Sequence, residues 1–182
     1  MIGARRIGKT DVSLHMALML WDKYHRQTMW IREVLETFKM NNFQNDFLND
    51  AYKFGWIHDV DEKHTWTCGN EGVRDPDGNL VIKFQSLSTY SSRRGPGHPD
   101  VDLMIFDEFI PEDRKYINAA LKGLMSLTKT VFSGRDGTTC ICTSNFVALS
   151  NPSFAGFEIF PDPKQDVTVW HEKGVAVERC RG

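Results

Sequence analysis

The apolar and polar positions of the chain alternate between helical and strand-like periods. Apolar residues recur at helical spacing in three segments, residues 9–25, 33–53 and 113–129. Apolar or alternating runs typical of strands are found at Thr28–Arg32, Val101–Phe106, Thr138–Thr143, Val167–His171 and Gly174–Cys180. Helices that alternate with nearly continuous apolar strands predict an α/β layered fold with a mostly parallel central sheet and flanking helices.

One segment interrupts this alternation. Asp75-Pro-Asp-Gly78 is a strong turn signal between the strand-like runs Thr65–Cys68 and Leu80–Phe84, which predicts an inserted β-hairpin. Residues 88–99 are rich in serine, glycine and proline and therefore predict a loop. Asn151-Pro152 is a further break in the chain, ahead of the last two strands.

Length and composition are those of one globular domain. The chain has 182 residues, of which 41% are hydrophobic and 25% are charged. No run approaches the roughly 20 apolar residues of a membrane span. The positive charges at residues 5–6 are not followed by the apolar segment of a signal peptide. We therefore expect a cytoplasmic protein without a membrane partner.

The cysteines and histidines favour neither disulfides nor a zinc site. Cys140 and Cys142 alternate within an apolar run, while Cys68 and Cys180 are isolated. The six histidines are scattered and form no ligand pair at helical spacing. Proteins that coat DNA over a broad surface are usually basic, whereas this chain has a net charge of −2. Any contact with DNA should therefore use a small local patch.

Residues 3–10 fit the phosphate-binding pattern G-x-x-x-x-G-K-[ST]. A match arises by chance in roughly one chain in a hundred of this length, and the helical pattern that follows strengthens it. Glycines let the backbone curl so that its N–H groups face the phosphates of ATP, and the positive end of the following helix points at the same anion. Lys9 is expected to reach the β- and γ-oxygens and the Thr10 hydroxyl to ligate Mg²⁺. The expected nucleotide-binding residues are Gly3, Ala4, Arg5, Arg6, Ile7, Gly8, Lys9 and Thr10.

The apolar strand Val101–Phe106 ends in two acids, Asp107 and Glu108. Both carboxylates should emerge at the carboxyl edge of the sheet, where ligands bind in such folds. Asp107 can then hold the Mg²⁺ shell, and Glu108 can act catalytically by polarising the attacking water. A solvated strand end is the alternative for an isolated acidic pair. Behind a P-loop, adjacent Asp-Glu favours the P-loop NTPase fold of the additional-strand catalytic-glutamate type.

A third strand, residues 138–145, ends in polar residues. In the additional-strand branch this strand lies beside the one that ends in Asp107, and its polar tip can sense the γ-phosphate. Ser144 and Asn145 are the candidates for that contact. An ordinary strand end followed by a turn is the alternative.

Four arginines are candidate anion contacts. Arg135 lies in a glycine-flanked loop just before the third strand, at the expected nucleotide edge, and could stabilise charge on a neighbouring subunit's γ-phosphate. Arg93 and Arg94, in the loop before Val101, are the best local contacts for DNA phosphates. A solvated role is the alternative for all three loop arginines. Arg32 ends a strand on the same edge and is either structural or nucleotide-facing.

Four blocks of the chain resemble a known family, the DNA-packaging ATPase of small protein-primed podophages, which are relatives of large terminase subunits. The blocks are the P-loop at residues 3–10, Ile105-Phe-Asp-Glu-Phe-Ile110, Thr130-Val-Phe132, and Cys140-Ile-Cys-Thr-Ser-Asn145 with Asn151-Pro152 following. The resemblance assigns Gly3, Arg5, Gly8, Lys9 and Thr10 to the nucleotide motif, Asp107 and Glu108 to the acidic pair, and Ser144 and Asn145 to a coupling segment.

Two positions depart from the family pattern. Arg6 stands where the family motif has glycine, and Ser133 stands where the family's trans-acting arginine follows Thr-Val-Phe. Arg135 is the nearest arginine to that place. The family also carries a C-terminal nuclease-like domain without nuclease activity, for which 182 residues leave no room. We therefore expect residues 1–182 to be a single ATPase domain, whose first strand is either reduced to a stub or starts upstream of Met1.

The resemblance implies a homomeric ring, with five subunits expected, on the portal or connector of a viral procapsid in the host cytoplasm. ATP hydrolysis there would translocate double-stranded DNA inward, whereas the isolated domain would be a weak, mostly monomeric ATPase. Two alternatives are a RecA-like or AAA+ helicase-type motor and a nucleotide-gated assembly module without useful turnover. The intact Lys9, Asp107 and Glu108 argue against the assembly module.

Overall fold

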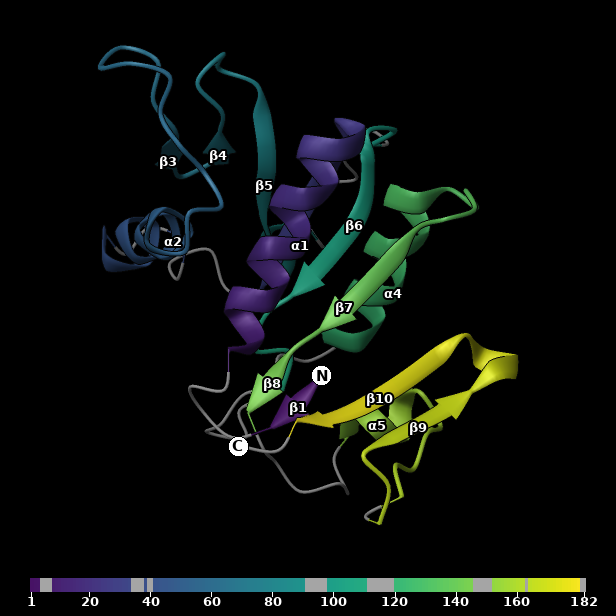
Figure 1. The fold of residues 1–182 in the computed structure, drawn as a ribbon. Coiled ribbons are helices and arrows are strands. Elements are labelled where there is room, and N and C mark those ends of the chain that lie inside the picture. The colour runs from purple at the N-terminus through teal and green to yellow at the C-terminus, as the bar shows by residue number, and fades with distance from the viewer. Residues whose placement is uncertain are drawn as a thin grey trace.

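Two strands, β2 (Gln27–Arg32) and β6 (Val101–Phe106), lie at the centre of the molecule. Successive side chains of a strand point to opposite faces of the sheet. Helices cover both of these faces, so the apolar residues of the two strands, Met29–Ile31, Val101 and Leu103–Phe106, are all buried. The result is a layered α/β fold (Figure 1). The computed structural model describes residues 1–3, 8–33, 38, 41–90, 98–110, 120–145, 152–162 and 164–180.

The larger sheet has six strands in the order β3-β4-β5-β2-β6-β7. Strands β5, β2, β6 and β7 pair in parallel, whereas β3 and β4 add to one edge as antiparallel strands. The strands not yet given are β3 (Thr67–Gly69), β4 (Gly72–Arg74), β5 (Leu80–Ser86) and β7 (Thr139–Cys142).

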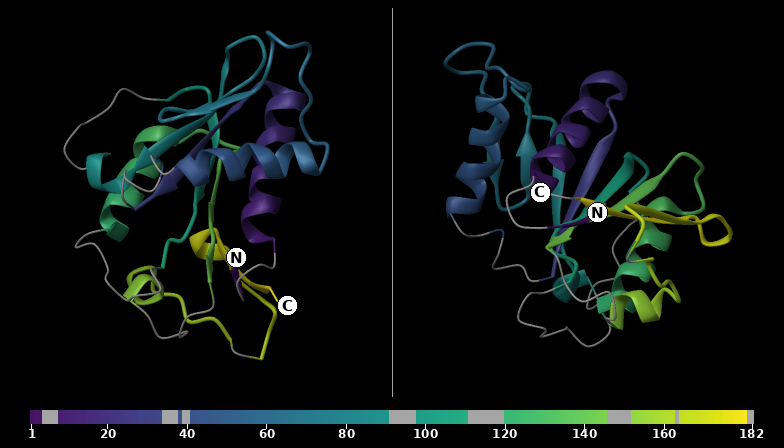
Figure 2. Two further views of the ribbon diagram at one scale, coloured as in Figure 1. Left: turned by 90° about the vertical axis from the view of Figure 1, so that its left-hand side faces the viewer. Right: turned by 60° about the horizontal axis from the view of Figure 1, so that its bottom comes forward.

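A smaller sheet of four strands continues from β7, in the order β8-β1-β10-β9. The two-residue strand β1 (Ile2–Gly3) pairs in parallel with both β8 (Ser144–Asn145) and β10 (Val175–Cys180). Strand β9 (Val167–Trp170) pairs antiparallel with β10. The pairing of β1 with β10 also brings the two ends of the chain close together (Figure 2). Only Thr143 separates β7 from β8, so the chain passes from one sheet to the other at this residue.

The helices divide between the two faces of the larger sheet. The first core cluster joins α1 (Lys9–Tyr24) and α2 (Asn41–Lys53) to side chains such as Trp30 of β2 and Ile105 of β6. The second joins α3 (Leu87–Tyr90) and α4 (Ala120–Phe132) to the opposite face of the same two strands. A third cluster packs α5 (Pro152–Gly156) against β1 and β10, and a 3₁₀ turn at His171–Lys173 links β9 to β10.

The expected mixed α/β fold with a mostly parallel sheet is confirmed. The expected hairpin is wrong in its pairing. The turn at Asp75–Gly78 forms, but it joins β4 to β5, and the run Leu80–Phe84 belongs to β5, beside β2 in the parallel part of the sheet. Its side chains Val81, Ile82 and Phe84 are buried, as expected for a strand covered on both faces.

Of the expected helix at residues 33–53, the structure describes α2 from Asn41 to Lys53, while residues 34–37, 39 and 40 lie outside the described residues. The expected helix at residues 113–129 needs correction at its end. The segment of residues 113–129 is helical from Ala120 to Phe132 within the described residues, because the apolar stripe of Leu124, Leu127 and Val131 continues onto the sheet. Pro152, which the sequence placed at a break, begins the short helix α5 within the described residues. Of the helices described here, none is both long and apolar enough to cross a membrane.

Candidate functional site

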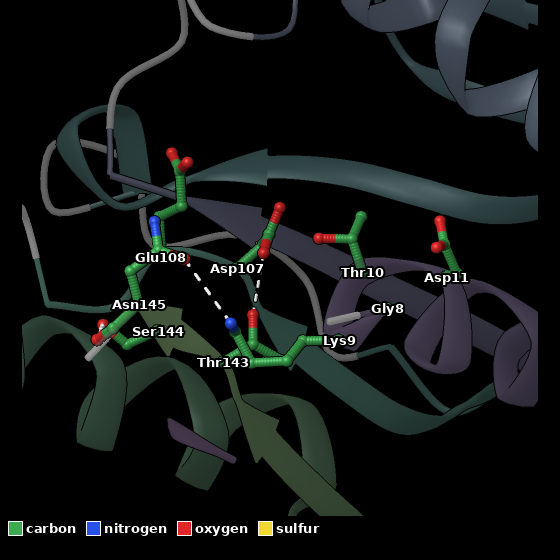
Figure 3. Close-up of a pocket in the computed structure, with 9 residues that line it drawn as sticks. All are labelled: Gly8, Lys9, Thr10, Asp11, Asp107, Glu108, Thr143, Ser144 and Asn145. Atoms are coloured by element: carbon green, nitrogen blue, oxygen red, sulfur yellow. Dashed lines mark hydrogen bonds between the residues drawn. The ribbon is translucent and has the colours of Figure 1, made fainter. Parts of the chain in front are cut away.

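Three segments meet at the carboxyl edge of the sheet and enclose one pocket (Figure 3). The start of α1, the residues that follow β6, and the junction of β7 with β8 each contribute side chains. The pocket has a volume of about 200 Å³. Its lining residues are Gly8, Lys9, Thr10, Asp11, Asp107, Glu108, Thr143, Ser144 and Asn145. The structure thus brings Gly8, Lys9 and Thr10 of the first motif together with Asp107 and Glu108 of the second.

The N-terminus of α1 opens onto this pocket. Gly8 has a φ of 76°, in the left-handed region that favours glycine, and its carbonyl oxygen accepts the first helical hydrogen bond from Val12 N–H over 2.8 Å. The chain therefore enters the helix by a sharp bend. The first N–H groups of a helix and its positive dipole end form a favourable place for an anion.

Lys9 is the cation among the described residues that line the pocket. Only 9% of the residue is exposed, and Nζ donates a 3.4 Å hydrogen bond to Oδ1 of Asn145. Burial lowers the pKa of Lys9 below its ordinary value, and the nearby Cys180 and Asp107 oppose that shift. A partly desolvated ammonium group next to a helix N-terminus is well placed to gain from an incoming anion.

Asp107 is held from two sides. Oδ2 accepts a 2.7 Å hydrogen bond from Nη2 of Arg32, and Oδ1 accepts a 2.7 Å hydrogen bond from the hydroxyl of Thr143. Its own backbone N–H donates to the Ile31 carbonyl oxygen of β2 over 3.0 Å. Only 4% of the Asp107 side chain is exposed. A buried carboxylate needs such partners, because an unpaired one would carry a large desolvation cost.

Glu108 differs from Asp107 in both exposure and backbone. Its side chain is 60% exposed, and its carboxylate points away from Lys9 (Figure 3). Its φ of 57° lies in the left-handed region, which costs a non-glycine residue of order 1 kcal/mol or more. Such strain is common at functional sites, although His25, Ser133 and Glu158 share the conformation outside the pocket.

Arg32, for which the sequence left two roles open, faces the acids. Besides Asp107, its guanidinium lies 3.7 Å from Oε2 of Glu108, and its Cζ lies 4.5 Å from the ring centroid of Phe43 in α2. The flat guanidinium thus stacks on an aromatic ring while its edge meets two carboxylates. Among the described residues no partner is found for the buried Nε atom.

The two candidate sensor residues diverge, because successive side chains of a strand point to opposite sides. Asn145 turns toward Lys9. The Ser144 hydroxyl, in contrast, is buried and donates to the carbonyl oxygen of Ile110 over 3.2 Å. Of the pair, Asn145 has the contact expected of a residue near the phosphates.

The donor set fits Mg²⁺. The Thr10 hydroxyl and the Asp107 carboxylate line the same pocket, and both are hard oxygen ligands. Within the described ranges, no group of three His, Cys, Asp or Glu side chains could hold a metal by itself. Mg²⁺ usually keeps several waters and takes one or two protein oxygens together with substrate phosphates, so two donors suffice.

Several predicted residues lie elsewhere. Gly3 ends β1, next to Asn145 of β8. Residues 4–7, which include Ala4, Arg5, Arg6 and Ile7, fall outside the described residues, as do Arg93 and Arg94. Their proposed contacts with nucleotide and DNA therefore stay predictions.

The expected position of Arg135 is wrong. It lies at the amino edge of the sheet, where Nη1 donates to Oδ1 of Asp102 over 2.7 Å and Nη2 donates to the Val101 carbonyl oxygen over 2.6 Å. A loop that precedes a parallel strand lies at the edge opposite to the loops that follow the strands. Arg135 precedes β7, whereas Asp107 follows β6, so the two are at opposite ends. Arg135 ties α4 to the start of β6.

Thr143 is a contact that sequence reasoning missed. The polar run Thr143-Ser144-Asn145 drew attention to its last two residues only. The alternation of a strand was an available signal, because residues two apart share a face and Thr143 therefore lies on the side of Asn145.

Comparison with known proteins identifies the family. The family model described as podovirus DNA encapsidation protein (Gp16) matches residues 1–180. The DNA packaging protein of Bacillus phage phi29 is 30% identical over 174 residues, which are 94% of this chain and 49% of that protein. The chain thus spans about half the length of the curated relatives it matches.

Two solved structures are similar to the whole fold. The N-terminal domain of the DNA packaging ATPase from bacteriophage phi29 has a TM-score of 0.82 at 29% identity, covering 98% of this chain and 87% of that one. A chain of the phi29 viral genome packaging motor assembly has a TM-score of 0.80 at 29% identity, covering 98% of this chain and 51% of that one. Because the family model matches residues 1–180, almost the whole of this chain, the chain belongs to the podovirus DNA encapsidation protein (Gp16) family.

Proposed function

We propose that this chain binds ATP with Mg²⁺ in the pocket at the carboxyl edge and hydrolyses it to ADP and phosphate, and that hydrolysis drives double-stranded DNA into a viral procapsid. One observation carries the proposal. Lys9 and Thr10 from the glycine-rich motif line the same pocket as Asp107 and Glu108 from the acidic strand end, although the two pairs are far apart in the sequence.

Nucleotide binding would rest on the start of α1. The left-handed Gly8 directs the helix N-terminus into the pocket, and the partly buried Lys9 ammonium would pair with the phosphate oxygens. Asn145, which now accepts a hydrogen bond from Lys9, would be displaced toward the terminal phosphate or would share the lysine with it. Residues 4–7 would complete the cradle with their backbone N–H groups.

Hydrolysis would rest on the acids. When bound, Mg²⁺ neutralises charge on the phosphates, and Thr10 and Asp107 would hold it. Glu108 would orient a water for attack on the terminal phosphate. Its exposure favours this role, because a carboxylate at the mouth of the pocket can accept a hydrogen bond from water. Arg32 would give the two acids different roles. It holds the Asp107 carboxylate at 2.7 Å, whereas the Glu108 carboxylate, 3.7 Å away, stays mostly exposed to solvent.

The strand order supports the additional-strand catalytic-glutamate type of P-loop fold. Strands β7 and β8, with Thr143 between them, lie between β6, which ends in the acids, and β1, which precedes the glycine-rich motif. An extra strand at this position is what that type requires. It also lets a third segment, Thr143–Asn145, reach the pocket.

The proposal for DNA packaging rests on family membership. The similar phi29 structures are described as a DNA packaging ATPase domain and as a viral genome packaging motor assembly. By analogy, we propose that this chain works in a homomeric ring on the portal of the procapsid, with Arg93 and Arg94 as candidate contacts to DNA phosphates. Without further segments, a net charge of −2 should leave it a weak, mostly monomeric ATPase in dilute solution.

Steady-state phosphate release tests the proposal. Glu108→Gln should still bind ATP but lose about 10²- to 10⁴-fold in turnover, the contribution typical of a general base. Glu158→Gln is the matched control, because Glu158 also has a left-handed backbone, with a φ of 53°, and lies outside the pocket in an ion pair with Lys173. ATP binding without phosphate release in the wild type would favour the nucleotide-gated assembly module instead.

A further inference from the structure

We infer that Thr143 is a positioning residue that fixes the Asp107 carboxylate for Mg²⁺, so that the junction of β7 and β8 contributes to metal binding through Asp107. The inference rests on the proposed function, because it concerns the metal that would accompany ATP. The backbone of Thr143 forms two hydrogen bonds with the segment Phe106–Phe109, which carries both acids. Its N–H donates to the Phe106 carbonyl oxygen over 2.9 Å, and its carbonyl oxygen accepts from Phe109 N–H over 3.0 Å.

The side chain of Thr143 adds a third link to that segment. Its hydroxyl donates to Oδ1 of Asp107 over 2.7 Å, and only 1% of the residue is exposed. A hydrogen bond from a neutral hydroxyl to a charged carboxylate is among the strong ones, and in a buried place it is not exchanged for water. With Arg32 bound to Oδ2, rotation of the carboxylate about its last bond is restrained at both oxygens.

The two contacts of Asp107 differ in what an incoming cation would do to them. Arg32 is positively charged and would be repelled by a divalent cation near Oδ2. Thr143 is neutral and donates to the other oxygen, so its bond is compatible with a metal shell on Oδ2. Thr143 is therefore the partner that can keep Asp107 in one orientation both without and with Mg²⁺. Such outer contacts of ligand residues typically contribute 10- to 100-fold to metal affinity.

The segment Thr143–Asn145 also reaches the side of the pocket formed by Lys9. Thr143 and Asn145 lie two residues apart, share a face, and contact Asp107 and Lys9 respectively. A shift of this strand would therefore move the metal-binding acid and the phosphate-binding lysine together. If Thr143 had only a structural role, loss of its hydroxyl would not change how Mg²⁺ affects nucleotide affinity.

The experiment measures how Mg²⁺ changes the affinity for a fluorescent ADP. In Thr143→Val, which keeps the shape and removes the hydroxyl, the Mg²⁺ concentration for half-maximal enhancement should rise by about 10- to 100-fold. Affinity in EDTA should stay at the wild-type value. Thr143→Ser should restore most of the Mg²⁺ dependence. Thr28→Val is the matched control, because Thr28 is fully buried and its hydroxyl has no partner among the described residues.

The outcomes separate this inference from the proposed function. If Thr143→Val keeps the wild-type Mg²⁺ dependence while Asp107→Asn loses it, the inference is overturned and the proposed function stands. If Mg²⁺ has no effect on the wild type, both fail. Should Thr143→Val not fold, Thr143→Ala and Thr143→Ser give the same comparison at smaller volume, with the alanine variant expected to lose the dependence and the serine variant to keep it.

Discussion

The two ends of strand β6 carry the same motif with different consequences. At the amino end Asp102 is held by two arginines, with Nε of Arg26 at 2.6 Å and Nη1 of Arg135 at 2.7 Å. Just past the carboxyl end Asp107 is held by Arg32 and Thr143, each at 2.7 Å. Charge density is therefore similar at both ends, and it does not by itself tell which end is the site.

The surroundings of the two acids make the difference. Around Asp102 the arginines use their other donors on backbone carbonyl oxygens, including those of Pro99 and Val101, so the cluster closes on itself. Around Asp107 the chain leaves a pocket with a desolvated lysine and a glutamate in a strained backbone conformation. Left-handed non-glycine residues occur at both ends, with His25 and Ser133 near the arginines of Asp102 and Glu108 next to Asp107. The open pocket with its desolvated lysine is therefore what distinguishes the carboxyl end as the candidate site.

Removing Arg32 should produce the largest effect. Arg32→Ala leaves the buried Asp107 without its cation, and breaking such a pair typically costs about 3–5 kcal/mol in unfolding free energy. Because a bound divalent cation would replace the missing charge, MgADP should stabilise this variant more than it stabilises the wild type. Denaturant unfolding with and without MgADP measures both. Equal stabilisation of the two proteins by MgADP would contradict the account.

Removing Arg135 should affect stability alone. Arg135→Ala loses the ion pair with Asp102 and several carbonyl contacts, and we expect a loss of about 1–3 kcal/mol, since hydrogen bonds to charged groups contribute about 1.5–3 kcal/mol and this site is partly screened by solvent. Nucleotide affinity should not change. A weaker affinity for ATP in a folded Arg135→Ala variant would return Arg135 to the functional site.

The contribution of Asp102 to the free energy of unfolding should depend on pH. The hydrogen bonds from Arg26, together with the charges of Arg26 and Arg135, lower the pKa of Asp102. A depressed pKa in the folded state means that this stabilisation is present above the pKa of the unfolded aspartate, about 3.9, and is lost as the pH falls through the lower folded value.

The stability difference between wild type and Asp102→Asn should therefore stay constant from neutral pH to about pH 5 and shrink below pH 4. Unfolding curves at several pH values measure it. A difference that grows on acidification would have the wrong sign for a paired carboxylate.

Relieving the strain at Glu108 should have the smallest effect. Glycine adopts a φ of 57° without steric cost, so Glu108→Gly should be more stable than Glu108→Ala by about 1 kcal/mol, although both lack the carboxylate. Thermal unfolding of the two variants provides the measurement. Equal stability, or a more stable alanine variant, would mean that the backbone at residue 108 relaxes and stores no strain.

The periodicity of the sequence was sufficient for the layered fold. The central strands are apolar on both faces, and the expectation at Val101–Phe106 agrees with β6 residue for residue. Which strands pair with one another was harder to predict, because the apolar pattern of a strand does not determine which strand lies beside it. Leu80–Phe84 pairs with β2 as well as β4, and the two residues of β1 gain their strand character only from β8 and β10 on either side.

The candidate site was predictable where a sequence motif specifies residue types at fixed spacing. Lys9, Thr10, Asp107 and Glu108 meet in one pocket, although their chemical roles stay predictions. Arg135 was misplaced because flanking glycines and proximity to a motif do not tell on which edge of a sheet a loop lies. Strand alternation could have placed Thr143 on the face of Asn145, but its hydrogen bond to Asp107 is visible only in the folded chain.

Equilibrium binding of ATP in the presence of Mg²⁺ tests the central claim most directly. Lys9→Ala should bind ATP at least about tenfold more weakly than the wild type, because a hydrogen-bonded charge in a partly buried place contributes about 1.5–3 kcal/mol. Lys173→Ala, which removes a lysine paired with Glu158 outside the pocket, should bind as the wild type does. Equal affinity for ATP in the wild type and in a folded Lys9→Ala variant would contradict the assignment of this pocket to the nucleotide.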